Sequence, residues 1–297
     1  QLFSHSLSEE AYGEVNFMAR GIYHANIINT VSPTYAREIM TPEGGAGLDG
    51  LLRYRQGDLH GILNGLDYDE WNPGADPRLA APYSLEDMTG REENRRALQA
   101  AVGLPQLANI PILGMVTRLD WQKGMDIVGH ALHLLMNGYS GPAQFVVLGT
   151  GASHYEDMFR QLASFHREKM SAYIGYHAEL APLLYAGSDM FLMPSLFEPC
   201  GLGQMIAMRY GSVPLVRATG GLADTVQDGI TGYTFYDFSA DALFNAIQRA
   251  TYTYNTDRDS WRRIQANGMT TNFSWERSAQ GYQQLYSWAI AQMRYYG

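Results

Sequence analysis

The sequence contains very little cysteine, very little lysine and no long hydrophobic run. Its 297 residues include one cysteine, Cys200, and two lysines, Lys123 and Lys169, among 21 basic residues. A single cysteine excludes an internal disulfide framework and a cysteine-rich zinc site. The apolar runs are strand-sized and far shorter than the roughly 18 residues that a membrane span requires. The composition therefore points to a globular protein without disulfides, and we expect no membrane partner.

Basic charge is also scarce. Thirty acidic against 21 basic residues leave a formal charge of −9, whereas tracking a nucleic-acid backbone requires a basic surface. The eight histidines form no H-E-x-x-H pattern and no cluster with metal-ligand spacing, so we expect no metal. The glycines at 149 and 151 lack the full dinucleotide spacing, and neither a G-x-S-x-G elbow nor a Walker motif is present. We predict no resident cofactor and no nucleic-acid partner.

What the sequence does have is a regular alternation of apolar runs and amphipathic segments from about residue 111 onward. Residues 125–136 and 154–167 carry apolar side chains at three- and four-residue spacing, which predicts helices. The expected strands are 111–119, 144–149, 171–176, 189–193 and 213–216, with further helices at 179–186 and 202–210. Strands alternating with helices are typical of a parallel sheet covered on both faces, so the prediction is an α/β fold.

The first hundred residues are less regular. We expect a helix end running into a strand at 23–32, a strand and turn at 59–65, a loop at 74–84 and a helix at 92–102. Glycine and proline at 103–107 indicate a domain boundary. The chain is thus divided into an N-terminal domain (1–105), a second domain (106–274) and a C-terminal helix (275–297), on which Tyr282, Leu285 and Trp288 share one face.

Three segments carry residues suited to chemistry, and each follows an expected strand. In the first, Thr117-Arg-Leu-Asp-Trp-Gln-Lys-Gly124, the cations Arg118 and Lys123 could clamp a polyanion such as a diphosphate. Ligands bind beyond the carboxyl ends of strands in open parallel sheets, which favours this interpretation. The alternative is that both are solvated charges on a loop.

The second segment is Phe197-Glu-Pro-Cys-Gly-Leu-Gly-Gln204, and the third is Ala218-Thr-Gly-Gly-Leu-Ala-Asp224. A glycine-rich turn into a helix presents free backbone N–H groups to an anion. Glu198 would then lie beside that anion and stabilise developing positive charge, act as a nucleophile, or simply begin the helix. A lone cysteine is more often a small buried residue than a nucleophile, which is the interpretation we favour for Cys200.

Together these segments resemble the donor-binding half of bacterial glycogen synthases and plant starch synthases. T-R-L-D-W-Q-K-G, F-E-P-C-G-L-G-Q and V-P-L-V-R-A-T-G-G-L-A-D-T-V carry the resemblance. Residues 30–38, 61–67 and 71–73 agree with it, so it covers essentially the whole chain. It implies a GT-B fold of two facing Rossmann-like domains, the N-terminal one incomplete here. It also implies retaining transfer of glucose from ADP-glucose to the non-reducing end of an α-1,4-glucan, in a bacterial cytoplasm or a plastid stroma.

The resemblance also implies roles for individual residues. Arg118 and Lys123 match the pair that holds the donor diphosphate, and Glu198 matches the acidic residue beside the transferred glucose. The remaining matches are donor contacts: Tyr176 near the adenine, Gly201 and Leu202 at sugar and phosphate, Asn64 at the glucose from the opposite lobe, and Thr219, Gly220 and Gly221 around the distal phosphate.

The sequence departs from the family pattern at its start, because neither the K-x-G-G-L loop nor the H-N-x-x-Y-Q-G stretch is present. In addition, Gly203 stands where many members carry threonine. Two alternatives therefore stay open beside a glucan synthase. One is a fragment that binds nucleotide sugar without turnover, and the other is a phosphorylase-like enzyme in which Lys123 carries pyridoxal phosphate. The sequence does not choose between ADP-glucose and UDP-glucose.

Overall fold

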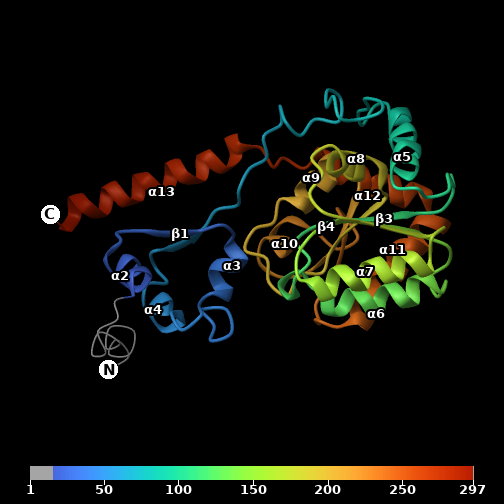
Figure 1. Ribbon diagram of the computed structural model, residues 1–297. Helices are drawn as coiled ribbons and strands as arrows, with labels where there is room; N and C mark the ends of the chain where they lie inside the picture. Colours follow the sequence, from blue (N-terminus) through green and yellow to red (C-terminus); the bar gives the residue numbers. More distant parts are fainter. Residues whose placement is uncertain (1–15, 297) are drawn as a thin grey trace.

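The computed structural model describes residues 16–296, which form a large lobe, a small lobe and a long C-terminal helix (Figure 1). The large lobe is built on a six-stranded sheet with the order β5-β4-β3-β6-β7-β8, and all of its pairs are parallel. Its strands are β3 (Ile112–Val116), β4 (Gln144–Gly149), β5 (Met170–Ile174), β6 (Met190–Met193), β7 (Val213–Arg217) and β8 (Tyr233–Phe235). The predicted α/β fold with a parallel sheet is confirmed.

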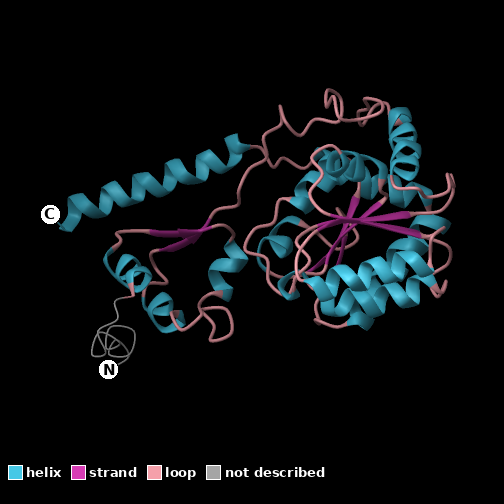
Figure 2. Ribbon diagram, in the orientation of Figure 1, coloured by secondary structure: helices cyan, strands magenta, loops and turns pink. Residues whose placement is uncertain are grey.

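Helices cover both faces of this sheet (Figure 2). On one face lie α6 (Met125–Met136), α7 (Ser153–Phe165) and α11 (Ala240–Thr256); on the other lie α5 (Thr89–Ala101), α8 (Leu180–Gly187) and α9 (Gly203–Arg209). Alternate strand residues feed the two cores: Phe145 and Val147 belong to the first, Val146 and Leu148 to the second. This alternation follows from the two-residue period of a strand, and burial on both faces explains why the strands are apolar throughout.

The predicted bounds of α6 and β4 are the observed ones. The helix expected after the glycine-rich turn at 218–224 is α10 (Gly220–Thr225), whereas three later elements were not predicted: β8, α11 and α12 (Arg258–Thr270). For α11 a signal was present, because Ser239 accepts from Ala242 N as the N-cap and Leu243, Ile247, Ala250 and Tyr254 follow at helical spacing. Its many threonine, tyrosine and asparagine residues weaken helix propensity and obscured that pattern.

The small lobe contains a two-stranded parallel sheet of β1 (Ile28–Thr30) and β2 (Leu59–Gly61). Around it lie α2 (Phe17–His24), α3 (Pro33–Glu38) and α4 (Asp49–Tyr54), which share a small core with β2. Residues 1–15, the start of the predicted N-terminal domain, lie outside the described residues.

The C-terminal helix α13 (Trp275–Tyr296) lies along the small lobe (Figure 1). Asn29 Nδ2 donates to Tyr282 Oη over 3.5 Å, the Trp288 ring centroid lies 5.1 Å from that of His60, and Leu285 is buried. Its sequence neighbours before Trp275 belong to the large lobe, so the helix carries the chain from one lobe to the other.

Helix α5 packs against α8 of the large lobe although it precedes the boundary predicted at 103–107. Arg91 Nη1 donates to the carbonyl oxygen of Ala186 over 2.8 Å, and Leu98 is fully buried in the core that α8 shares. The boundary itself stays a prediction, but the hydrophobic core of the large lobe includes residues from both sides of it.

Replacing Leu98 with alanine tests this packing. We expect Leu98→Ala to lower the free energy of unfolding by about 2–5 kcal/mol, because it leaves a cavity between α5 and the sheet. Leu107→Ala, which truncates a leucine exposed on the following connection, should change it by less than about 1 kcal/mol. Urea unfolding of both variants provides the measurement. Equal losses would contradict the assignment of α5 to this core.

Candidate functional site

The three predicted segments meet at the carboxyl edge of the large sheet. Leu196 N donates to the carbonyl oxygen of Gln122 over 2.8 Å, and Gln122 Nε2 donates to that of Phe197 over 3.3 Å. Gly221 N donates to the carbonyl oxygen of Glu198 over 3.0 Å. The loops after β3, β6 and β7 are therefore joined backbone to backbone, and their side chains converge on one place.

At the centre of this place is an ion pair between Glu198 and Lys123. Glu198 is 7% exposed, and its Oε2 accepts from Lys123 Nζ over 2.6 Å and from Ser195 Oγ over 3.1 Å. Lys123 ends the short 3-10 helix η2 (Trp121–Lys123), which Asp120 caps by accepting from Lys123 N over 3.0 Å. A buried carboxylate that is both paired and hydrogen-bonded keeps a fixed orientation.

Two glycines allow the loops to approach this closely. Gly124 has a φ of +81°, and a Cβ there would overlap the carbonyl oxygen of Pro194. Gly220 has a φ of +45°, and a Cβ there would overlap the carbonyl oxygen of Glu198. The glycines of the first and third segments thus serve the contact between loops, as well as any approach of a ligand.

Arg118 and Tyr176 lie apart from the ion pair and line a separate cavity of about 430 Å³. The Arg118 side chain is 66% exposed and pairs with Asp120 over 2.9 Å, while Tyr176 is 89% exposed. The cavity lies beyond the ends of β3, β4 and β5, where Thr117, Thr150 and Gly175 contribute to its wall. The two predicted cations consequently engage different carboxylates, with Lys123 on Glu198 and Arg118 on Asp120.

The opposite wall of this cavity was not predicted. Trp71 and Arg78, from the connection between β2 and α5, line it together with Glu70. The Arg78 guanidinium lies 5.1 Å from the Trp71 ring centroid, and Asp76 Oδ1 accepts from Arg78 Nε over 2.7 Å. For Arg78 the composition gave no signal, because residues 74–84 are rich in proline, alanine and aspartate and predict only a loop.

The remaining predicted donor contacts lie on the loops that lead into α9 and α10. Gly201, with a φ of +73°, and the exposed Leu202 precede α9. Thr219 Oγ1 and Gly220 N both donate to Glu38 Oε1, over 2.9 and 2.8 Å. Glu38 belongs to α3 of the small lobe and was not predicted as a site residue, because nothing in its local sequence marks a contact 181 residues away.

A second carboxylate contact joins the same two helices, and here the acidic side chain belongs to the large lobe. Asp224 of α10 accepts from Thr34 N over 2.8 Å and from Thr34 Oγ1 over 2.6 Å. Each of the two short helices α3 and α10 therefore has its first turn bound by an acidic side chain of the other. Such contacts satisfy backbone N–H groups that lack a partner within the helix.

Asn64 and Cys200 meet between the lobes. The backbone of Asn64 hydrogen-bonds the Cys200 thiol, and burial raises the pKa of that thiol. Cys200 is free and buried, which confirms its interpretation as a packed residue. A protonated thiol is a weak nucleophile, so the chemistry of this site rests on its other side chains.

Within residues 16–296 there is no group of three histidine, cysteine, aspartate or glutamate side chains placed to hold a metal ion. Over the same residues, no helix has the length and apolarity needed to cross a membrane.

The wall formed by Arg78 should be sensitive to acid. Burial alone would raise the pKa of Asp76, but hydrogen bonds from Arg78 and Tyr210 outweigh it, so the folded pKa lies below its ordinary value. The stabilisation is present above the unfolded pKa of about 3.9 and is lost as the pH falls through the folded pKa. At pH 7 we expect Asp76→Asn to lower the free energy of unfolding by about 1–3 kcal/mol.

This difference from wild type should begin to shrink as the pH falls below about 4, since Asp76 in the unfolded wild-type chain then binds a proton while the folded state resists it. Urea unfolding at pH 7, 5 and 3.5 measures it, with Asp69→Asn as a control that removes an exposed carboxylate. A difference that stays constant over this range would show that the charge of Asp76 contributes nothing.

Comparison with known proteins shows what this chain is similar to. Residues 110–251 match the family described as glycosyl transferases group 1, and residues 2–54 match the starch synthase catalytic domain. The chain is 46% identical over 291 residues to a glycogen synthase of Thermosipho africanus, covering 96% of this chain and 59% of that protein. It is 49% identical over 286 residues to glycogen synthase 2 of Geobacter sulfurreducens, covering 94% and 58%.

Solved structures agree. The catalytic domain of starch synthase IV from Arabidopsis thaliana, bound to ADP and acarbose, superposes with a TM-score of 0.87 at 39% identity, covering 93% of this chain and 58% of that one. Sucrose-phosphate synthase from Thermosynechococcus elongatus, at 22% identity and a TM-score of 0.64, shares the fold. The chain spans less than two thirds of the curated relatives it matches. These matches favour a synthase over a phosphorylase, and the chain is a homologue of the bacterial glycogen synthases and plant starch synthases with their GT-B glycosyltransferase fold.

Proposed function

We propose that this chain supplies the donor-binding side of a retaining glucosyltransferase that moves glucose from ADP-glucose to the non-reducing end of an α-1,4-glucan. The observation that carries the proposal is that the buried Glu198–Lys123 pair and the cavity lined by Arg118 and Tyr176 are both at the carboxyl edge of one parallel sheet. Ligands of open α/β sheets bind at this edge. The two substrates are ADP-glucose and the glucan, and no resident cofactor is part of the proposal.

The charges at this site suit departure of a nucleoside diphosphate. Breaking the glucosyl–phosphate bond builds negative charge on the phosphate and positive charge on the sugar ring. Lys123 has three N–H donors, so it can hold Glu198 and a phosphate oxygen together, and Arg118 lies on the same loop. Glu198 supplies the opposite charge next to the ring. Fixed charges of both signs then stabilise the transition state without reorganising.

Within this proposal, the configuration is retained by attack on the same face that the phosphate leaves. The departing phosphate oxygen takes the proton of the acceptor hydroxyl, so no protein base is required. Glu198 is poorly suited to be a covalent nucleophile, because its Oε2 is held by Lys123 and Ser195. The recovery of a glucosyl group attached to Glu198 after incubation with donor would contradict this mechanism.

For the donor, the proposal favours adenine over uracil. The Arabidopsis starch synthase IV structure, which superposes most fully among those described above, is bound to ADP and acarbose. The cavity beyond β3, β4 and β5 carries Tyr176, Trp71 and Arg78, aromatic and guanidinium groups that can stack on a base. Its position next to Arg118 connects a base there to a diphosphate near Lys123.

Calorimetric titration of this chain with ADP, and with UDP for comparison, tests the proposal. We expect ADP to bind more tightly, and Arg118→Ala and Lys123→Ala each to weaken it by about 10–100-fold, the effect of losing a hydrogen bond to a charged group. Arg167→Ala, an exposed arginine at the opposite edge of the sheet, is the matched control and should leave the affinity unchanged. Tighter binding of UDP would overturn the donor assignment, and binding of neither would contradict a donor site in this chain.

Glu198→Gln separates binding from catalysis. We expect it to keep ADP affinity within about threefold while lowering glucosyl transfer by at least about 100-fold, since the carboxylate acts on charge that develops only in the transition state. The measurement is the initial rate of labelled glucose transfer from ADP-glucose to a maltooligosaccharide. Wild-type chain that binds ADP but transfers no glucose would support the alternative of a binding fragment.

A further inference from the structure

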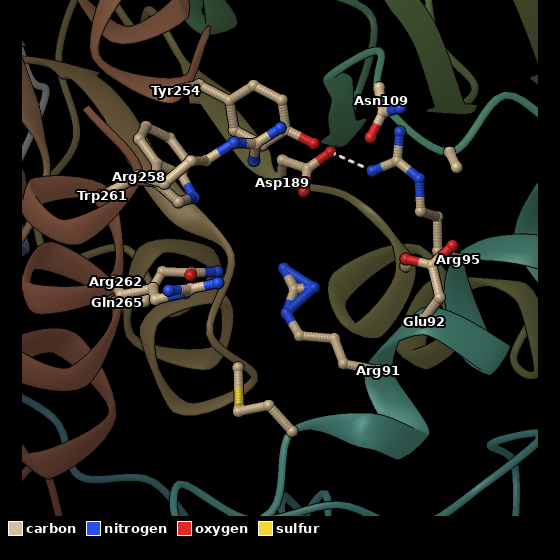
Figure 3. Close-up of a pocket in the computed structure, with 13 residues that line it drawn as sticks. Arg91, Glu92, Arg95, Asn109, Asp189, Tyr254, Arg258, Trp261, Arg262 and Gln265 are labelled. Carbon is tan, nitrogen blue, oxygen red and sulfur yellow. Dashed lines mark hydrogen bonds and ion pairs between the residues drawn. The ribbon is translucent and has the colours of Figure 1, made fainter. Parts of the chain in front are cut away.

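A second cavity, of about 390 Å³, lies between α5 and α12 (Figure 3). It is at the amino edge of the large sheet, because its lining residue Asp189 immediately precedes β6 and accepts from Ile112 N, the first residue of β3. The cavity lined by Arg118 and Tyr176, called the donor cavity below, lies at the carboxyl edge. Strands of about five residues, with a rise of about 3.3 Å per residue, separate the two edges of the sheet by roughly 17 Å. The two cavities are therefore distinct.

Arg91 brings an uncompensated positive charge to this cavity. Its residue is 7% exposed, and its guanidinium donates to the carbonyl oxygens of Ala186, Ser188 and Gly211. Among residues 16–296 it forms no ion pair, and its Nε has no hydrogen-bond partner. Figure 3 shows the guanidinium projecting toward the middle of the cavity. A buried charge without a counterion is costly, and an anion beside it would remove that cost.

Two further arginines stand on the α12 side. Arg258 and Arg262 are one helical turn apart and both line the cavity. The Arg258 guanidinium lies 3.6 Å from the Tyr254 ring centroid, which orients it. The Arg262 side chain is 77% exposed and its pair with Asp259 is 3.5 Å long, so little holds it in place.

The lining also carries two acidic side chains, Asp189 and Glu92. Asp189 is paired with Arg95, and Glu92 lies beside that pair (Figure 3). Within the described residues, Arg91 and Arg258 form no ion pair, and Arg262 pairs only with Asp259, so these three arginines of the lining are not neutralised by its acidic residues. This is a concentration of basic charge in a chain whose formal charge is −9.

We propose that this cavity binds a small molecule bearing a phosphate group, with the phosphate held by Arg91, Arg258 and Arg262. Planar guanidinium groups match the oxygens of phosphate and form charge-assisted hydrogen bonds with them. The volume falls in the range of small-molecule sites, about 300–1,000 Å³, and exceeds what inorganic phosphate needs. Asn109 and Gln265 add amide groups to the lining that suit the hydroxyls of a phosphate ester.

Calorimetric titration of the full chain with inorganic phosphate, ribose 5-phosphate and ribose tests this inference. We expect saturable binding of the phosphate-bearing probes and none of ribose. Arg262→Ala and Arg258→Ala should each weaken binding about tenfold, as expected for loss of one charge-assisted contact. Arg263→Ala is the matched control, because Arg263 lies on the same helix, donates to Ser260 Oγ and does not line the cavity.

Phosphate could also bind at the donor site, and Arg118→Ala distinguishes the two. Binding that survives Arg118→Ala but weakens in Arg262→Ala supports the second site, whether or not the chain binds ADP. Tighter binding of ribose 5-phosphate than of phosphate would identify an ester as the ligand class, and the reverse would identify the free ion. Absence of binding, or equal affinity in Arg262→Ala, Arg258→Ala and Arg263→Ala, would overturn the proposal.

Discussion

Backbone contact among the loops that follow β3, β6 and β7 is the constraint on which the candidate active site depends. The loop of Gly124 lies directly on Pro194, and that of Gly220 on Glu198, at distances that leave no room for a Cβ. Because these loops are in contact, Lys123 from the first reaches Glu198 in the second. Any side chain at either glycine would push the two loops apart. The Lys123–Glu198 pair would then lose its geometry although neither of its residues had been substituted.

The same loops join the two lobes. Glu38 of α3 binds the start of α10, and Asp224 of α10 binds the start of α3, so each lobe contributes an acidic side chain to the other. The Asn64 backbone adds a contact to Cys200. Thr219 and Gly220, which are predicted to contact the donor diphosphate, are therefore held in part by the small lobe. Any change in the position of one lobe relative to the other would be transmitted directly to these two residues.

The two edges of the large sheet carry different chemistry. The carboxyl edge combines acid, base and aromatic groups around the Glu198–Lys123 pair and the cavity of Arg118 and Tyr176. The amino edge collects arginines from α5 and α12 around Asp189. Helix α5 contributes Arg91 to this second cavity and Leu98 to the hydrophobic core of the large lobe. An anion bound at Arg91 would therefore stabilise the large lobe.

The amino-acid sequence by itself determined the alternation of strands and helices and the identity of the three site segments. Those features are local: apolar periodicity specifies α6 and β4, and a glycine-rich turn after a strand indicates where a ligand can approach. Only the tertiary structure decided that Lys123 pairs with Glu198 while Arg118 pairs with Asp120, that Trp71 and Arg78 close the donor cavity, and that Glu38 reaches Gly220. Apart from the Arg118–Asp120 pair, these arrangements join residues far apart in the chain, and their partners depend on how strands and loops pack, which no local pattern records.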